Sequence, residues 1–368
     1  MDPQSQFCHN PSCPARGQVG QGTIRVHSQK ERRYRCTTCG HTFAATTGTP
    51  FYRLHQAADL LVVVLTLLSH GCPRQAIVAA FGLDERTVAR WQARAGEHCQ
   101  QVHQHLVQQG GVELGHVQAD ELWVKVVGGK VWMAMALAVP SRLWLGGVVS
   151  VHRDGELITR LVAMVRSCAR TWAFLVCVDG FSSYVTAFLR VFRHPVRTGK
   201  RGRPRLVIEP GLLLAQVVKQ YAQRHVVSVR HRIVRGSPEA IAAALAATGG
   251  GKRINTAYIE RLNATFRSCL APLIRRGRAL VHQQSGLTAG MYLVGCAYNL
   301  CWEHDSLRVQ PPAGGGQRGQ ERTPAMAAGL TDHRWTMTEL LRFQVPLSPW
   351  MAPKRRGRPP QAVRPAPA

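Results

Sequence analysis

The order of strand and helix patterns after Val112 most constrains the fold of this chain. Segments that alternate apolar and polar residues, typical of strands, are separated by turns at Gly128-Gly129 and Pro140-Ser141. Later segments have the apolar spacing of a helix, a buried strand and another helix. The six patterns in order are 116–127, 131–139, 143–151, 156–169, 172–178 and 181–189. We therefore expect one β-β-β-α-β-α domain over residues 112–305.

This order is that of an α/β, ribonuclease-H-like core with a mixed sheet. In that fold the first and fourth strands lie side by side at the sheet centre. Asp120 is on the first strand pattern and Asp179 ends the fourth. The sequence thus predicts that these two carboxylates are neighbours.

A third acid lies on the segment 255–267. Glu260, Asn263 and Arg267 are spaced three and four residues apart, which places them on one face of a helix. The apolar residues needed for the other face recur at helical spacing: Tyr258, Ile259, Leu262 and Phe266. Together with Asp120 and Asp179, this helix predicts a carboxylate triad.

Hard oxygen ligands select magnesium or manganese, and we expect Asp120, Asp179 and Glu260 to hold two such ions. Two ions can stabilise the attacking and leaving oxygens of a phosphodiester displacement, with water or a DNA 3′-hydroxyl as nucleophile. Arg267 could bind the phosphate through its guanidinium, and Asn263 could orient it.

Each acid also has an ordinary interpretation: Asp120 as an edge-strand charge, Asp179 as part of a turn, Glu260 as a helix-surface residue. Glu121, next to Asp120, is an alternative to it, but strand alternation places Glu121 on the opposite face of the strand. The helix of Glu239 lacks an amide or arginine beside it. Cys177 has no histidine near it in the pattern, which argues against a thiol nucleophile.

The charge of the chain indicates a polyanionic partner. Its 47 Lys and Arg residues outnumber 20 Asp and Glu, giving a formal net charge of +27. Nucleic acid would neutralise this charge. An anionic membrane is the rival partner, but no basic amphipathic helix with a bulky apolar face is evident. We therefore expect double-stranded DNA and no membrane.

Residues 1–50 have the pattern of a small zinc ribbon. Two cysteine pairs flank two short strand patterns and could supply four thiolates to one structural zinc ion: Cys8, Cys13, Cys36 and Cys39. His9 is an alternative ligand to Cys8, and free surface cysteines are the alternative to a metal site. The polar residues 1–18 do not resemble a secretory signal. With the other cysteines reduced, we expect a cytoplasmic, nucleoid-associated protein.

Residues 55–108 read as an all-helical module with a helix-turn-helix. Helix patterns cover 57–69 and 74–81, and a third begins at Asp84. Apolar residues with the spacing for packing across the turn are Ile77, Phe81, Val88 and Trp91. Arginines expected to face the major groove are Arg86, Arg90 and Arg94. The alternative is a plain helical bundle with a solvated basic face.

The motif Arg-Gly-Arg-Pro occurs twice and could lie in an A·T-rich minor groove. Its alternative is a solvated loop. The arginines and lysine concerned are Lys200, Arg201, Arg203, Arg205, Arg355, Arg356 and Arg358. After the first copy, residues 212–223 read as a helix and 226–234 as a strand. Residues 306–368 form a Pro- and Gly-rich basic tail, expected to be mostly disordered apart from a short helix near 336–343.

Five stretches in this order resemble prokaryotic insertion-sequence transposases of the DDE type, near the group around insertion element one. They are Arg35–Phe43, the helix-turn-helix, Asp120–Trp123, Val178–Tyr184 and Ile259–Arg267. The resemblance implies that zinc ribbon and helix-turn-helix bind terminal inverted repeats. It also implies magnesium-dependent strand cleavage and transfer by Asp120, Asp179 and Glu260, in a homodimer or larger synaptic complex acting on target DNA.

Two other functions are compatible with the sequence. A non-catalytic DNA-binding regulator derived from a transposase would keep only the N-terminal modules, but would have no use for three carboxylates. A structure-selective nuclease of the same fold would not need a zinc ribbon and helix-turn-helix before its core. The transposase is therefore the leading hypothesis.

Overall fold

The computed structural model describes residues 1–126, 129–197, 199, 202–223, 225–273, 283–309 and 319–352. The chain forms two compact units. One comprises Met1–Thr47 and the chain from Gln344 onward, and the other Gly48–Phe343. Among the described residues no helix is long and apolar enough to cross a membrane.

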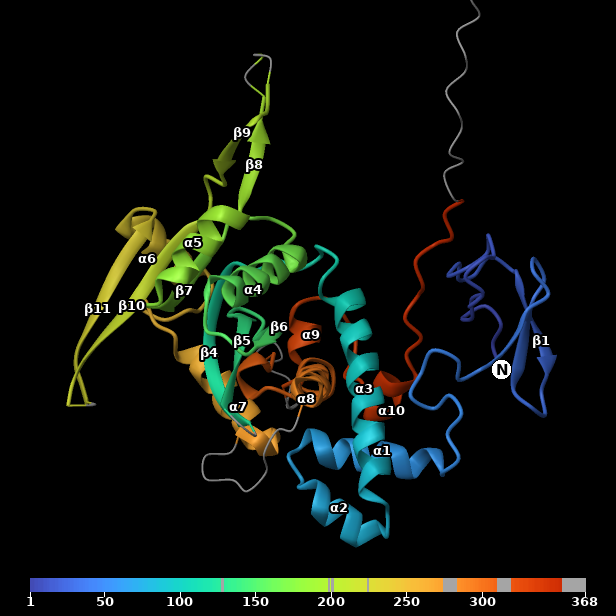
Figure 1. Cartoon of the computed structure of the whole chain (residues 1–368). Coiled ribbons are helices and arrows are strands. Elements are labelled where there is room, and N and C mark those ends of the chain that lie inside the picture. The colour runs from blue at the N-terminus through green and yellow to red at the C-terminus, as the bar shows by residue number, and fades with distance from the viewer. Residues whose placement is uncertain are drawn as a thin grey trace, which may run out of the picture. The chain divides into compact units, whose positions relative to one another are not determined.

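The larger unit is α/β and is built on a mixed six-stranded sheet, in the order β11-β10-β7-β4-β5-β6 (Figure 1). Its strands are β4 (His116–Val126), β5 (Gly129–Ala138), β6 (Leu143–Ser150), β7 (Leu175–Asp179), β10 (Leu213–Ala222) and β11 (His225–Arg235). β4, β5 and β6 form an antiparallel meander. β7 lies parallel between β4 and β10, so the first and fourth strands of the domain are neighbours.

Helices cover both faces of this sheet. Alternate residues of β4 separate the faces: Glu121 contacts one helix layer, while Gln118 and Asp120 contact the other. The first layer contains α4 (Gly155–Cys168) and α5 (Ser182–Val191). The second contains α6 (Pro238–Ala247), α7 (Ala257–Cys269) and α8 (Gln284–Cys296), which continues into the π-helix Ala297–Cys301. Trp144 of β6 fills the space between Phe266 of α7 and Gly295 of α8.

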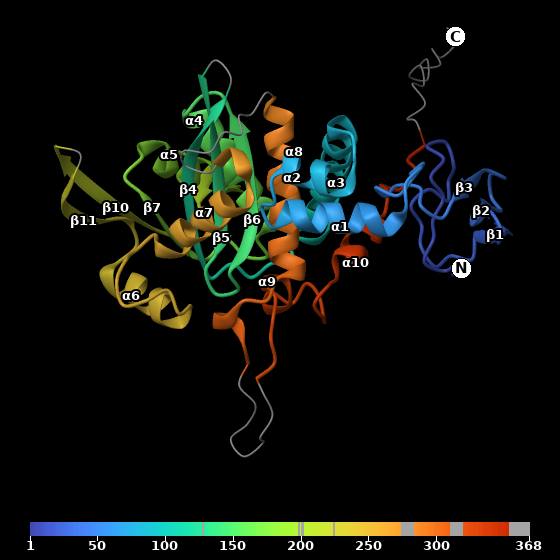
Figure 2. The ribbon, with the colours of Figure 1, turned by 90° about the horizontal axis from the view of Figure 1, so that it is seen from below.

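Three helices precede the sheet: α1 (Ala58–Ser69), α2 (Arg74–Phe81) and α3 (Glu85–Leu106). The Asp84 side chain accepts hydrogen bonds from the first turn of α3, as its position predicts. Ile77, Val88 and Trp91 are buried, but Phe81 is exposed and does not join this core. At Gly96, α3 contacts Ala289 of α8 so closely that no side chain would fit (Figure 2). α3 therefore belongs to both the three-helix module and the core.

The helix predicted over 212–223 is wrong, because this segment forms strand β10. Its apolar run fits a helix face and also a strand buried on both faces. Pairing with β7, from Leu213 opposite Leu175 to Val217 opposite Asp179, satisfies the backbone and buries the run. Tertiary contacts thus decide the structure here. β11 pairs antiparallel with β10 and confirms the strand pattern at 226–234.

The short helix predicted near 336–343 is confirmed as α10 (Met337–Arg342), and part of the rest of the tail, expected to be disordered, is also ordered. After the 3-10 turns Ala271–Leu273 and Asp305–Leu307, the chain forms α9 (Pro324–Ala327) and α10 (Met337–Arg342). α10 begins with a capping box between Thr336 and Glu339, and its Leu340 and Leu341 are buried. His98 of α3 lies 2.9 Å from the Leu340 carbonyl oxygen. This segment is ordered because its apolar side chains pack against α3.

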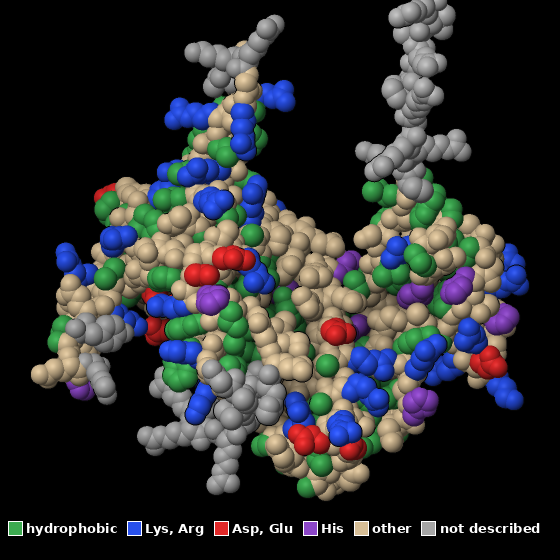
Figure 3. All heavy atoms as spheres, viewed as in Figure 1, with side chains coloured by type: hydrophobic (Ala, Val, Ile, Leu, Met, Phe, Trp, Pro, Cys, Tyr) green, Lys and Arg blue, Asp and Glu red, His purple; other side chains and the backbone are tan. Residues whose placement is uncertain are grey.

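A two-stranded hairpin, β8 (Arg193–Val196) and β9 (Arg205–Ile208), projects from the larger unit after α5 (Figure 1). Lys and Arg side chains gather along it (Figure 3). The first Arg-Gly-Arg-Pro motif therefore lies in the connection between two paired strands.

The smaller unit contains a three-stranded antiparallel sheet, β1 (Ile24–Ser28), β2 (Arg33–Cys36) and β3 (Thr42–Ala44). The C-terminal segment joins this unit. Gln344 Nε2 donates to the Ala45 carbonyl oxygen at 2.8 Å, and Leu347 lies against Gly17.

Candidate metal and nucleic-acid sites

The edge of the central strands carries a carboxylate cluster. Ala119 pairs with Val178 in parallel register, so the next residues along each strand, Asp120 and Asp179, come together. Carboxylate oxygens of Asp120, Glu121 and Asp179 all lie within 4.8 Å of one another. The donor set suits a hard divalent cation. The predicted proximity of Asp120 and Asp179 is confirmed.

One glutamine aligns helix α7 with strand β4. The buried Gln118 Oε1 accepts hydrogen bonds from the backbone N–H groups of Tyr258 and Ile259, at 3.0 and 3.1 Å. Two residues further along the strand, Asp120 Oδ2 accepts from Asn263 Nδ2 at 2.8 Å. The two strand contacts, Gln118 and Asp120, are about 7 Å apart, and so are the helix residues that they bind, which are four to five positions apart. Because the two spacings agree, both contacts form at once and hold α7 beside Asp120.

Glu260 lies on α7 one turn before Asn263 and lines the same cavity as the two aspartates. This cavity has a volume of 460 Å³, and its lining residues are Asp120, Arg153, Asp179, Gly180, Phe181, Val217, Val218, Lys219, Thr256 and Glu260. Glu260 is outside the group of three whose oxygens lie within 4.8 Å. Its Oε1 accepts from Lys219 Nζ at 2.8 Å and Thr256 Oγ1 at 3.0 Å.

Arg267 is not among the described residues that line this cavity. It lies seven residues beyond Glu260 on α7, which corresponds to about 10 Å along the helix axis. The cations that do line the cavity are Arg153, which follows β6, and Lys219 on β10. Phosphate binding by Arg267 stays a prediction, and Arg153 and Lys219 are two cations near the carboxylates that the sequence did not indicate.

Glu121 lies on the face of β4 opposite to Asp120, as strand alternation predicts, but its carboxylate joins the cluster, which the sequence did not indicate. The side chain leaves the opposite face of β4, where Tyr184 Oη donates to Oε2 at 2.7 Å. Arg153 Nε donates to Oε1 at 2.6 Å, and Arg153 Nη2 also lies 3.7 Å from Asp179. The neighbouring strand β7 ends at Asp179. The Glu121 carboxylate can therefore extend past the end of β7 to reach the two aspartates.

The cluster holds more negative than positive charge. Burial, followed by the charges of Glu121 and Asp179, raises the pKa of Asp120 to about 7. Burial and the Glu121 charge also raise the pKa of Asp179, against the opposing charges of Arg153 and Lys219. Three carboxylates, Asp120, Asp179 and Glu260, line the cavity with the cations Arg153 and Lys219, and the buried Glu121 lies beside them. A divalent cation would offset the repulsion among these acids. By contrast, burial raises the pKa of Cys177 to about 12, which makes its thiol a poor nucleophile.

Magnesium is expected to stabilise the protein more at high pH. Folding raises the pKa of Asp120 above its ordinary 3.8. Below about pH 4 Asp120 is protonated in the folded and the unfolded state, so it does not affect the free energy of unfolding. Between about pH 4 and about pH 7 the unfolded state ionises more readily, so the free energy of unfolding falls as pH rises. Bound Mg²⁺ would offset that loss, so we expect it to raise Tm by about 3 °C more at about pH 8 than at about pH 6. Thermal denaturation of the wild type and Asp120→Asn measures this; an equal shift in both proteins contradicts it.

The four predicted cysteines also come together. Their Sγ atoms lie within 4.8 Å of one another, with Cys8–Cys39 at 3.6 Å and Cys13–Cys36 at 3.9 Å. Tetrahedral zinc at 2.3 Å from each sulfur requires sulfurs about 3.8 Å apart. The cluster is therefore compatible with zinc. His9 is not in the group; its ring packs against Phe7 and Phe43.

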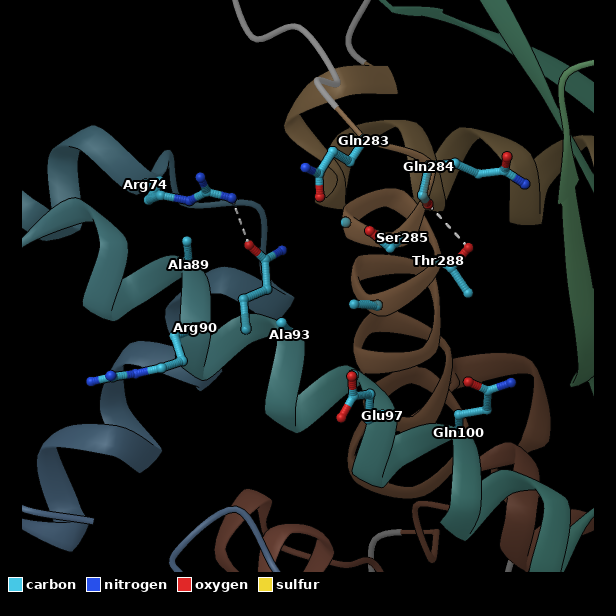
Figure 4. Close-up of a pocket in the computed structure, with 14 residues that line it drawn as sticks. Arg74, Ala89, Arg90, Ala93, Glu97, Gln100, Gln283, Gln284, Ser285 and Thr288 are labelled. Atoms are coloured by element: carbon cyan, nitrogen blue, oxygen red, sulfur yellow. Dashed lines mark hydrogen bonds between the residues drawn. The ribbon is translucent and has the colours of Figure 1, made fainter. Parts of the chain in front are cut away.

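The predicted DNA-facing arginines of α3 have different environments. Arg86 and Arg90 are exposed, whereas Arg94 donates to the Tyr52 carbonyl oxygen. Figure 4 shows the hollow of 810 Å³ between α3 and α8, with Arg74 donating to Gln92 at 3.0 Å. Of the three predicted arginines, Arg86 and Arg90 in the first turns of α3 are therefore the two that are exposed to solvent.

The basic motifs are partly described. Arg203 and Arg205 are exposed at the end of the β8–β9 hairpin. The remaining predicted contacts lie outside the described residues: Lys200, Arg201, Arg355, Arg356 and Arg358. Minor-groove binding stays a prediction.

No model of a protein family matches this chain, and no curated protein matches it.

Proposed function

We propose that this chain is a DDE-type DNA transposase that binds terminal inverted repeats and catalyses metal-dependent strand cleavage and strand transfer. The observation that carries the proposal is the cavity in which Asp120 and Asp179 meet and which Glu260 lines. The strand order and the central parallel pair β4–β7 support a ribonuclease-H-like core. A net charge of +27 supports a DNA substrate.

In this proposal the metal is bound by Asp120, Asp179 and Glu260. Neighbouring side chains position these carboxylates and Glu121. Bound magnesium or manganese, as two ions, would stabilise the charge that develops on the attacked phosphate. Asn263 fixes the Asp120 carboxylate by its 2.8 Å hydrogen bond. Arg153 and Tyr184 neutralise and orient Glu121. Lys219 pairs with Glu260 at 2.8 Å. Metal binding by Glu260 would release the Lys219 ammonium, which could then donate to a phosphate oxygen.

The other parts of the chain would bind DNA. The cysteine unit with zinc, and α3 through Arg86 and Arg90, would bind the repeats, and the β8–β9 hairpin would reach the adjacent groove. Two DNA ends must be brought together for transfer to a target duplex. The proposal therefore includes a homodimer or larger synaptic complex.

The test uses purified full-length protein and labelled duplexes copied from the DNA that flanks its gene on either side. With Mg²⁺ or Mn²⁺ we expect nicking at the element ends and joining of the labelled strand to a plasmid, and neither product with EDTA. Inverted repeats in the flanking DNA would locate the expected cuts. Tight DNA binding without nicking in either metal would instead indicate a DNA-binding regulator, and would overturn the proposal.

A further inference from the structure

A tryptophan pair lies on the β4–β5 hairpin, whose strand β4 carries two acids of the carboxylate cluster, and one of the two rings is largely exposed. Trp123 is 59% exposed, and it lies directly opposite Trp132 in the antiparallel register. On the other face of the same hairpin, Leu122, Val124 and Val131 are buried. The hairpin is therefore anchored by one face, while the tryptophan face is open to solvent.

Positive charges surround this pair. Lys130 lies over the Trp123 ring at 6.0 Å, and Arg153 lies over the Trp132 ring at 5.2 Å. Lys125 and Lys130 form the next cross-strand pair and are both exposed. Aromatic rings interleaved with Lys and Arg are the usual platform for single-stranded nucleic acid, since bases stack on the rings and phosphates contact the cations.

The tryptophan face adjoins the carboxylate cluster on its Glu121 side, while the Asp120 side chain leaves the opposite face of β4. Trp123 is two residues beyond Glu121 on the same side of β4, which corresponds to about 7 Å. Arg153 connects the two, because it contacts Glu121 and Asp179 as well as the Trp132 ring. About 7 Å is roughly two stacked base steps of 3.4 Å.

We propose that Trp123 and Trp132 form a stacking platform for an unpaired base of the DNA strand whose phosphate lies at the carboxylate cluster. A base in an intact duplex hides its faces in the stack, so the platform selects a frayed, flipped or overhanging base. This inference rests on the proposed function, and it adds that the substrate is unpaired next to the cut. A second copy of this chain is the rival occupant of an exposed tryptophan.

The experiment measures binding of the full-length protein, in Ca²⁺ without cleavage, to two DNAs of the same sequence. One is a blunt duplex, and the other has a short single-stranded overhang with 2-aminopurine at the first unpaired position. We expect the wild type to prefer the overhang about tenfold and to quench the 2-aminopurine fluorescence. Trp123→Ala should lose both effects, and Trp123→Phe should keep most of each. Val63→Ala, at an exposed apolar site on α1, serves as the matched control.

The measurements separate the tryptophan platform from the proposed function and from self-association of the chain. Loss of overhang preference in Trp123→Ala, with blunt-duplex binding unchanged, supports the platform even if no nicking is found with any metal. Equal preference in Trp123→Ala and the wild type overturns it, while nicking by both would leave the proposed function intact. A lower oligomer mass by light scattering for Trp123→Ala, with unchanged preference, also overturns it and identifies a second copy as the partner.

Discussion

Asp120→Asn is expected to reduce strand nicking by about 10³-fold or more, and to leave DNA binding within about twofold. Asparagine has the shape of aspartate, so the strand and the contact with Asn263 can persist. The amide is uncharged and a weak ligand for a hard cation. Losing the ion removes several kcal/mol of charge stabilisation in the transition state, and about 1.4 kcal/mol corresponds to tenfold in rate. Single-turnover nicking of labelled DNA measures the rate.

The control for this prediction is Glu239→Gln. Glu239 is an exposed acid in the first turn of α6 and does not line the cavity, so its neutralisation should leave nicking unchanged. Asp179→Asn should behave like Asp120→Asn, because its oxygens belong to the same cluster. If Asp120→Asn nicks DNA at the wild-type rate, the cluster is not the catalytic centre.

The sequence predicts the parts of this site that depend on local pattern. Alternation and turns locate β4, β5 and β6, and a short apolar run ending in Asp179 locates β7. The α7 helix follows from its apolar spacing. Such signals suffice because each element buries one continuous set of residues, whatever the rest of the chain does.

The contacts between distant segments are not predictable in the same way. Residues 212–222 carry an apolar run that fits both a helix and a central strand, and only pairing with β7 decides between them. Lys219 was missed for that reason. The face of Glu121 was predicted correctly, but its place in the cluster was missed, because alternation does not give the reach of a side chain and this carboxylate extends past the end of β7.

Gln118 could have been recognised as important. It is a large amide at an inward position of a strand that is buried on both faces, and an unpaired buried amide is costly. A sequence pattern can state that such a residue needs a partner. It cannot state that the partners are Tyr258 and Ile259, 140 and 141 residues away.

Removal of zinc is expected to unfold the smaller unit and leave the larger one folded. The buried core of the smaller unit consists of the cysteine cluster and a few apolar side chains: Cys8, Cys13, Ala15, Ile24, Cys36, Tyr34 and Phe43. A core of that size does not offset the chain entropy of folding, whereas structural zinc contributes about 10 kcal/mol or more of binding free energy. Cys36→Ser, which removes one buried ligand, should therefore lose the bound zinc.

The measurements are zinc content by atomic absorption and limited proteolysis. We expect about one zinc per chain in the wild type and almost none in Cys36→Ser. Rapid cleavage should be confined to the two segments of the smaller unit, Met1–Thr47 and the chain from Gln344 onward. Cys72→Ser is the matched control, since Cys72 lies in the larger unit outside the cluster. Stoichiometric zinc in Cys36→Ser would contradict the assignment. If zinc is lost while joining of a pre-cut end persists, the zinc serves DNA binding through the smaller unit and not the chemistry at Asp120.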